Sequence, residues 1–150
     1  MGTGPLTAVE EAAWRAMLRA VLVLPRVVEA DLLVSSRLNM ADYTVLANLS
    51  EEPTQSMRMS DLAARAALSA SGITRVVERL AHQGLVERCR SEQDGRGQVA
   101  RLTDGGRTRL AEAYPDHVES VRRRVMDHFG AVDLAALTEA LNAIGLPEQS

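Results

Sequence analysis

The chain has 150 residues, enough for one domain with a packed core, and its 46% hydrophobic but only 3% aromatic composition favours packed helices over a β-sandwich. The net charge is −3, yet residues 56–109 carry ten arginines against six acidic residues, so that segment is net +4 and the remainder is net −7. The single cysteine excludes an internal disulfide, and without a long apolar run or a basic leader we expect a cytoplasmic protein with no membrane span.

Two helices are predicted before residue 55. The first is long and amphipathic: Thr7 and Glu10 form a capping-box pattern, and apolar residues recur at helical spacing from Trp14 to Leu32, with a kink expected at Pro25. The second is shorter. Its cap is expected within residues 39–42, its apolar positions are Tyr43, Leu46 and Leu49, and it is predicted to end before residues 51–53.

A helix-turn-helix is predicted over residues 60–84. Ser60 is the expected N-cap of a short helix, Leu68 fills the turn, and Ser69 caps a second helix that ends at Gly84 in a left-handed conformation. In the second helix the spacing predicts a buried face made of Ile73, Val76, Val77 and Leu80. The predicted outward face of the same helix consists of Ser71, Thr74, Arg75 and Glu78.

A β-hairpin is predicted directly after this unit. Residues 85–90 and 98–102 have strand-like patterns, and residues 92–97 have the glycine-rich composition of a hairpin tip. Helix, turn, helix and hairpin in this order describe a winged helix-turn-helix, which places one helix in the major groove of DNA. The expected fold is therefore mainly α, with a two-stranded β wing.

The last third of the chain is predicted to be helical. A fifth helix is expected from near Thr103 to Phe129, bent at Pro115, and a last helix over residues 134–144, ended by Gly145 and Pro147. The apolar stripes of the terminal helices exceed what one small domain covers, so we expect them to pair with a second copy. A two-fold dimer would place two recognition helices about 34–36 Å apart on an inverted-repeat operator.

The wing residues resemble a known family. Asp94-Gly95-Arg96 with Arg101-Leu102-Thr103-Asp104 is similar to the D-x-R…R-L-T-x-x-G signature of the MarR regulators, and residues 71–80 resemble their recognition helix. The resemblance implies one domain over residues 1–150, with a DNA-binding lobe at about 40–106 and dimerisation helices at about 7–34 and 107–146. It implies a homodimeric, ligand-responsive repressor with no cofactor, no catalytic residues and no metal.

The predicted DNA contacts lie on the second helix of the motif and on the hairpin. Thr74 and Arg75 are expected to reach base edges or phosphate, and Arg96 at the hairpin tip is expected to enter the minor groove, with Asp94 holding the tip. For Ser69, capping is an equally good explanation. The full predicted set is Ser69, Ser71, Thr74, Arg75, Arg79, Arg88, Arg90, Asp94, Arg96 and Arg101.

The resemblance also implies an effector pocket between the dimerisation helices and the DNA-binding lobe. A small aromatic ligand is the expected effector. The lining predicted from the sequence is Trp14, Tyr43, Leu46, Asp61 and Tyr114. For Trp14, an anchor in the dimer interface is an alternative.

Other functions were weighed against this prediction. An enzyme is disfavoured because the chain lacks H-E-x-x-H, a phosphate-binding glycine loop, G-x-S-x-G and a paired Cys/His set. Two alternatives stay open: a winged-helix protein-interaction module without DNA readout, and a thiol-based redox regulator using Cys89, for which a buried structural thiol is the competing interpretation. His117 and His128 are predicted on one helix face, too far apart for one metal ion and solvated or at an interface.

Overall fold

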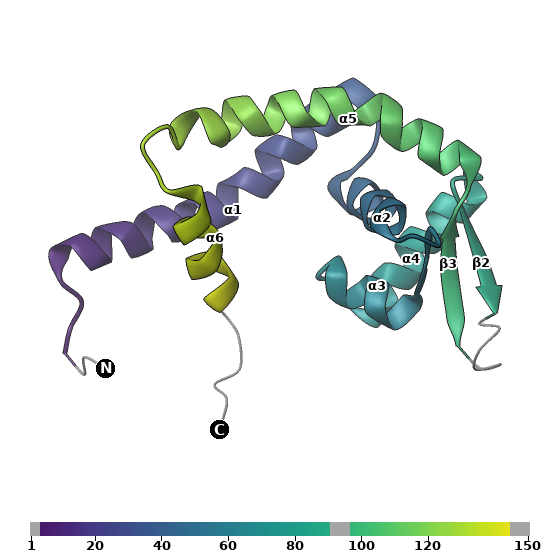
Figure 1. Ribbon diagram of the computed structural model, residues 1–150, viewed down its shortest axis with the longest axis horizontal. Helices are drawn as coiled ribbons and strands as arrows, with labels where there is room; N and C mark the ends of the chain where they lie inside the picture. Colours follow the sequence, from purple (N-terminus) through teal and green to yellow (C-terminus); the bar gives the residue numbers. More distant parts are fainter. Residues whose placement is uncertain (1–3, 91–96, 145–150) are drawn as a thin grey trace.

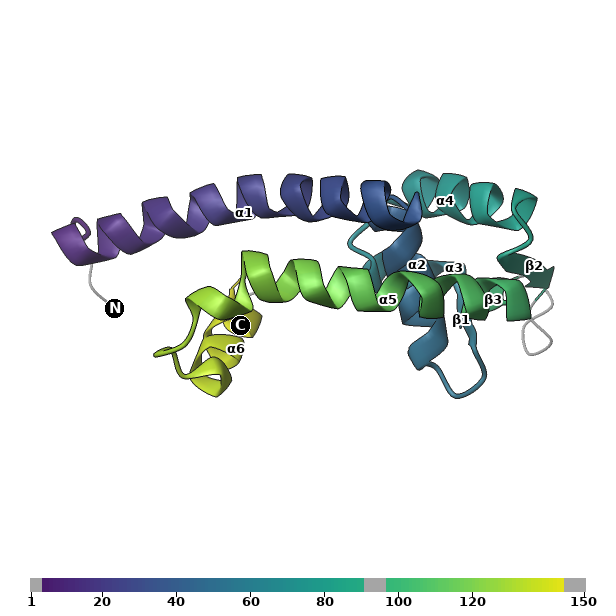
Figure 2. The ribbon, with the colours of Figure 1, turned by 90° about the horizontal axis from the view of Figure 1, so that it is seen from above.

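The computed structural model describes residues 4–90 and 97–144, which form two long helices joined to a small lobe of shorter helices and a sheet (Figure 1). The elements in chain order are α1 (Ala8–Ser36), α2 (Met40–Glu51), β1 (Ser56–Arg58), α3 (Met59–Arg65), α4 (Ala70–His82), β2 (Val86–Arg90), β3 (Gln98–Leu102), α5 (Asp104–Arg124), the 3-10 helix η1 (Met126–His128) and α6 (Leu134–Ala143). Helices α1 and α5 extend away from the lobe, and α6 follows at the far end of α5, while α1 continues beyond it (Figures 1 and 2).

Polar side chains at the helix starts explain where most helices begin. Thr7 accepts a hydrogen bond from the backbone of Glu10, whose carboxylate binds back to the backbone of Thr7, so the predicted capping box is confirmed. The side chains of Asn39, Ser69 and Thr103 cap α2, α4 and α5. The prediction for Ser60 was wrong. Helix α3 begins two residues earlier than this cap implied, at Met59 after Arg58, and its start has no side-chain cap.

One prediction about the long helices needs correction. Helix α5 does not reach Phe129: it ends at Arg124, because Val125 leaves helical geometry at φ −132°, and η1 follows after that break. The apolar periodicity continues across this break and therefore gave no sign of it. Both prolines lie inside continuous helices, Pro25 in α1 and Pro115 in α5. Gly145 and Pro147 lie outside the described residues.

The sheet has three strands in the order β1-β3-β2, all antiparallel. The predicted hairpin is present as β2 and β3, in a register that pairs Val86 with Leu102 and Arg90 with Gln98. The third strand, β1, was not predicted. It spans only three residues and pairs Met57 with Ala100, and so short a segment carries no usable alternation pattern.

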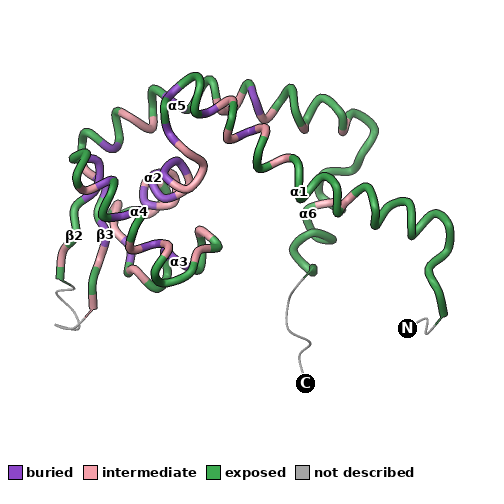
Figure 3. Tube along the Cα trace, turned by 180° about the vertical axis from the view of Figure 1, so that it is seen from behind, coloured by how far each residue is buried: buried purple, intermediate pink, exposed green. Residues whose placement is uncertain are grey.

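The hydrophobic core lies in the lobe. Fully buried leucines from α1, α2, α3 and α4 meet there, and Ala100 and Leu102 of β3 close it from the sheet side. Most residues of the first half of α1 and of α6 are exposed, in contrast to the lobe (Figure 3). Among the described residues, no helix combines the length and the apolar character needed to cross a membrane.

Candidate nucleic-acid interface

One face of helix α4 packs into the lobe, and the opposite face is exposed to solvent. Its predicted buried face is confirmed, since Ile73, Val76, Val77 and Leu80 are all buried in the core. The turn before it is tight: Ala67 adopts a left-handed conformation (φ 52°), and the backbone of Leu68 donates to the carbonyl of Ala63. This geometry aims the N-terminal half of α4 outward.

The first turns of α4 carry an exposed polar surface. Ser69 Oγ accepts from the Gly72 amide at 3.1 Å and lies 3.2 Å from Ser71 Oγ, so the capping role of Ser69 is confirmed. The Thr74 hydroxyl donates to the Ala70 carbonyl at 2.9 Å. Arg75 is exposed and has no hydrogen-bond or ion-pair partner within residues 4–90 and 97–144. Its guanidinium is therefore available to a ligand.

Arg79 differs from Arg75 although both lie on α4. Its guanidinium donates to the carboxylate of Asp42 on α2, with Arg79 Nε 3.1 Å and Arg79 Nη2 2.5 Å from Asp42 Oδ1. Asp42 is only 5% exposed, so this charge-assisted pair joins α4 to α2 in the lobe. Arg79 therefore binds another residue of the lobe. The position of Arg79 on the predicted DNA-reading helix gave no sign of this contact. Asp42 itself was read only as part of a helix cap.

The strand register places three arginines with the same predicted role on two different faces of the hairpin. Arg88 and Arg90 lie on the face of the hairpin that continues from the buried Val86, and Arg88 binds Glu78 of α4 at 2.9 Å. Arg101 points to the opposite face, because it pairs in register with Glu87. The guanidinium groups of Arg90 and Arg101 have no hydrogen-bond or ion-pair partner among the described residues.

The base of the hairpin is closed by the start of α5. Thr103 Oγ1 donates to the carbonyl of Gly84 at 2.7 Å and accepts from the amide of Gly106 at 3.0 Å. Gly84 has φ +73°, as predicted for the stop after α4. A side chain at Gly106 has no room, since a Cβ there would lie 2.1 Å from the Leu85 carbonyl oxygen. These contacts explain the threonine and the second glycine of the wing signature.

Asp94 and Arg96, the predicted tip of the wing, lie outside the described residues. Cys89 lies on β2 and is half-buried, so its thiol is less buried than the structural interpretation of the sequence predicted. Within the described part of the chain, no three His, Cys, Asp or Glu side chains are placed to hold a metal ion together.

A cavity of about 790 Å³ lies between α2, the second half of α5 and the segment leading into α6. It contains two of the predicted effector residues, Tyr43 and Tyr114. The other three predicted effector residues do not line it, and their role stays a prediction. Leu46 is fully buried in the core, whereas Trp14 on α1 and Asp61 on α3 are exposed and lie outside this lining. The remaining lining residues are Ala47, Ser50, Glu51, Leu110, His117, Val118, Val121, Arg122, Met126 and Leu134.

His117 is the distinctive polar group of this cavity. Its ring packs on Tyr43, with centroids 4.2 Å apart, and its Nδ1 atom is buried with no hydrogen-bond partner in the described part of the chain. Burial lowers the pKa of His117 from its usual 6.5, so the folded state favours the neutral imidazole. His117 is therefore not fully solvated, and its predicted alternative, a place at an interface, stays a prediction. His128 lies on η1 instead of on the same helix.

The lobe defines a class of protein. Helix α3, the turn and α4, followed by a β-hairpin that packs against α5, form a winged helix-turn-helix, and the outward polar face of α4 is the surface that this class presents to DNA.

Comparison with known proteins identifies the family. The sequence model of the MarR family matches residues 38–97. The chain is 40% identical to AbsC, a MarR family transcriptional regulator from Streptomyces coelicolor, with 93% of each chain covered and a TM-score of 0.83. It is 31% identical to Sco3205 from the same organism, solved in complex with DNA, covering 98% of this chain and 94% of that one at a TM-score of 0.88. The chain belongs to the MarR family of transcriptional regulators.

A more distant neighbour has the same fold. The transcriptional regulator BldR from Sulfolobus solfataricus is 28% identical, with 91% of this chain and 96% of that chain covered, at a TM-score of 0.71. A comparison with curated protein sequences gives no match. These relatives are regulators of transcription, in agreement with the class that the lobe defines.

Proposed function

We propose that the protein is a homodimeric repressor that binds an inverted-repeat operator without catalysis and releases it when a small ligand binds. The observation that carries this proposal is the division of α4 into two faces. One face is buried in the core, and the other presents Ser71, Thr74 and Arg75 to solvent. The solved DNA complex of Sco3205 supports DNA as the partner.

The proposed contact surface divides into reading and positioning residues. Thr74 and Arg75 are proposed to reach base edges, because they project from the first half of the recognition helix. Ser69 and Ser71 lie at its N-terminus, where backbone amides and the helix dipole favour phosphate. Phosphate contacts are proposed for Arg88, Arg90 and Arg101, and Asp94 and Arg96 stay predictions from the sequence. For Arg79, the pair with Asp42 favours a structural role.

Replacing Arg75 tests the DNA-reading surface. Arg75→Ala is expected to weaken operator binding by about 1–3 kcal/mol, because a guanidinium that has no partner among the described residues is lost from the groove-facing side. The measurement is a fluorescence anisotropy titration at several salt concentrations on an operator selected from random DNA. Arg26→Ala on α1 is the matched control, since it removes an exposed arginine outside the lobe. Equal affinities of Arg75→Ala and parent would remove Arg75 from the site.

The proposed dimer rests on apolar surface that the chain leaves uncovered. On α1, Trp14, Leu18, Val21 and Leu22 are between 43% and 63% exposed and share one stripe. On α6 and beside it, Leu134, Leu141 and Ile144 are about half exposed or more. Apolar patches shared by two distant helices are typical of an interface between subunits.

A charge placed in this stripe is expected to separate the subunits. Parent protein at micromolar concentration should scatter light as about twice 16.3 kDa, whereas Leu18→Glu/Val21→Glu should give the monomer mass, because carboxylates cannot be buried unpaired between subunits. The circular dichroism of the lobe should persist. Ala16→Glu, on the opposite face of α1, is the control and should remain dimeric. A monomeric parent would contradict the proposed architecture.

The proposed effector site is the cavity beside Tyr43. Its walls are mainly apolar, a few polar groups converge on it, and its size suits a small organic molecule. It lies against α2, the helix that also holds α4 through Asp42. A ligand here must prefer the conformation that does not bind DNA, and DNA must then weaken ligand binding by the same factor.

Filling the cavity is expected to abolish the ligand response and keep DNA binding. Val118→Trp places an indole in the space that a ligand would use, and neither Val118 nor its neighbours on α5 belong to the proposed DNA surface. The assay screens phenolic, urate-like and antibiotic compounds for release of operator DNA. Glu112→Trp, on the exposed side of α5, is the control and should respond like the parent. If Val118→Trp responds normally, the effector site lies elsewhere.

A further inference from the structure

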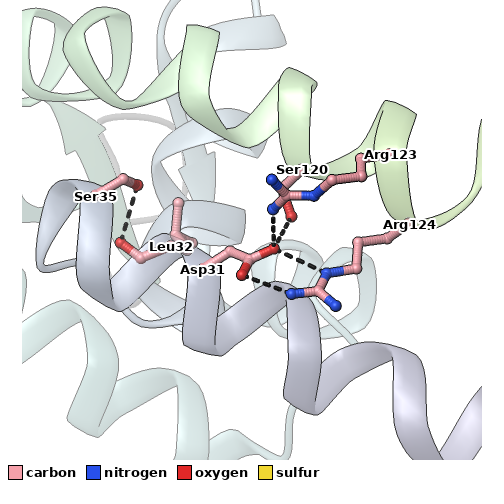
Figure 4. Close-up of polar contacts among 6 residues, drawn as sticks. All are labelled: Asp31, Leu32, Ser35, Ser120, Arg123 and Arg124. Atoms are coloured by element: carbon pink, nitrogen blue, oxygen red, sulfur yellow. Dashed lines mark hydrogen bonds and ion pairs between the residues drawn. The ribbon is translucent and has the colours of Figure 1, made fainter.

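One carboxylate holds α1 and α5 together outside the core of the lobe (Figure 4). Asp31 of α1 accepts hydrogen bonds from three side chains of α5: the Ser120 hydroxyl at 2.6 Å, Arg123 Nη2 at 3.1 Å, and Arg124 through Nε at 3.0 Å and Nη2 at 2.9 Å. Arg124 thus binds both carboxylate oxygens in the fork geometry that fixes direction as well as distance.

The cluster is built to stay charged and ordered. Hydrogen bonds from Arg124 and then from Ser120 hold the pKa of Asp31 well below its usual 3.8, so the carboxylate is ionised over the whole physiological range. Ser120 is only 3% exposed, and its hydroxyl is directed at the carboxylate from within the α1–α5 contact.

A second tie lies further along the same pair of helices. Arg109, near the start of α5, donates to the backbone carbonyl of Ser36 at the end of α1. Leu32 and Ala113 are buried between the two ties. The helices run in opposite directions, so the two ties fix both the crossing angle and the rotation of α5 relative to α1.

This junction connects the two functional halves of the molecule. The exposed apolar stripe of α1 and helix α6 lie on one side of it, and the lobe with α4 lies on the other (Figures 1 and 2). A change of angle at the junction is therefore magnified at the recognition helix.

We infer that Asp31 is a positioning residue for DNA binding, which sets the distance and orientation of α4 relative to the first half of α1 and thereby the half-site spacing that a dimer accepts. The inference rests on the proposed dimeric function. It does not require Asp31 to contact DNA, a ligand or the second subunit.

The direct test measures the geometry within one chain. Nitroxide labels are placed at Arg19→Cys on α1 and Gln83→Cys after α4, in a Cys89→Ser background, and the labelled protein is diluted with excess unlabelled protein. Both label sites are exposed. Pulsed electron paramagnetic resonance should give one narrow distance distribution for the parent and a broadened or shifted one for Asp31→Asn. Glu29→Gln removes the same charge from a neighbouring residue whose side chain has no hydrogen-bond or ion-pair partner among the described residues, and this variant should match the parent.

The functional test compares operators. The ratio of affinities for the parent half-site spacing and for a spacing one base pair longer should fall about threefold or more in Asp31→Asn, within the range of couplings in shared polar networks. If Asp31→Asn lowers the melting temperature but keeps the parent's distance distribution and the parent's ratio of affinities for the two spacings, the role of Asp31 is merely structural and the inference is overturned. A parent that binds no DNA would overturn the proposed function instead, and the distances would still report whether Asp31 sets the angle.

Discussion

Gly106→Ala is expected to destabilise the folded chain by about 3 kcal/mol, because there is no space for a methyl group at the start of α5. A Cβ at this position would lie 2.1 Å from the carbonyl oxygen of Leu85 and 2.7 Å from a methyl carbon of Leu102. The first contact is with backbone, which cannot rotate away, so α5 must shift from the sheet. The hydrogen bond between Thr103 and the amide of Gly106 would be disturbed with it.

Urea unfolding followed by circular dichroism measures this effect. Gly130→Ala is the control, since a Cβ there meets nothing within 4 Å, and its change should stay within about 0.5 kcal/mol. We expect Gly106→Ala to lose operator affinity as well, because the hairpin and α5 share this contact. A stability equal to that of the parent would contradict the close packing at Gly106.

Arg79→Met is expected to cost about 2 kcal/mol of folding free energy, although Arg79 lies on the recognition helix. The substitution leaves the carboxylate of Asp42, which is 5% exposed, without its charged partner. Removing one partner of a buried pair costs about 3–5 kcal/mol, and the 43% exposure of the Arg79 side chain reduces this value by solvent screening.

A double-mutant cycle with Asp42→Asn separates this structural role from DNA contact. The unfolding free energies of the two single variants and of the double variant should be strongly non-additive, since both remove the same interaction. Operator affinity, measured at a temperature where every variant is folded, should fall much less for Arg79→Met than for Arg75→Ala. An unchanged stability with a large loss of affinity would instead assign Arg79 to the DNA interface.

Local features of this protein could be predicted from its sequence because they depend on neighbouring residues. The caps at Thr7, Asn39 and Ser69 are hydrogen bonds across three residues, and the buried face of α4 follows from the period of a helix. The left-handed Gly84 is likewise a property of one turn. These elements in order, together with the wing signature, were sufficient to predict the winged helix-turn-helix and the family.

Features that depend on distant residues were decided only by the tertiary structure. Asp42 and Arg79 are 37 residues apart, and Asp31 lies 89 to 93 residues from its partners on α5. The strand register separated Arg88 from Arg101, and packing placed Leu46 in the core and His117 beside Tyr43. Periodicity along a chain reports which residues face inward, but the choice of partner for a buried charge or ring follows from how helices cross. That crossing is set by the packing of the whole core, which no local pattern contains.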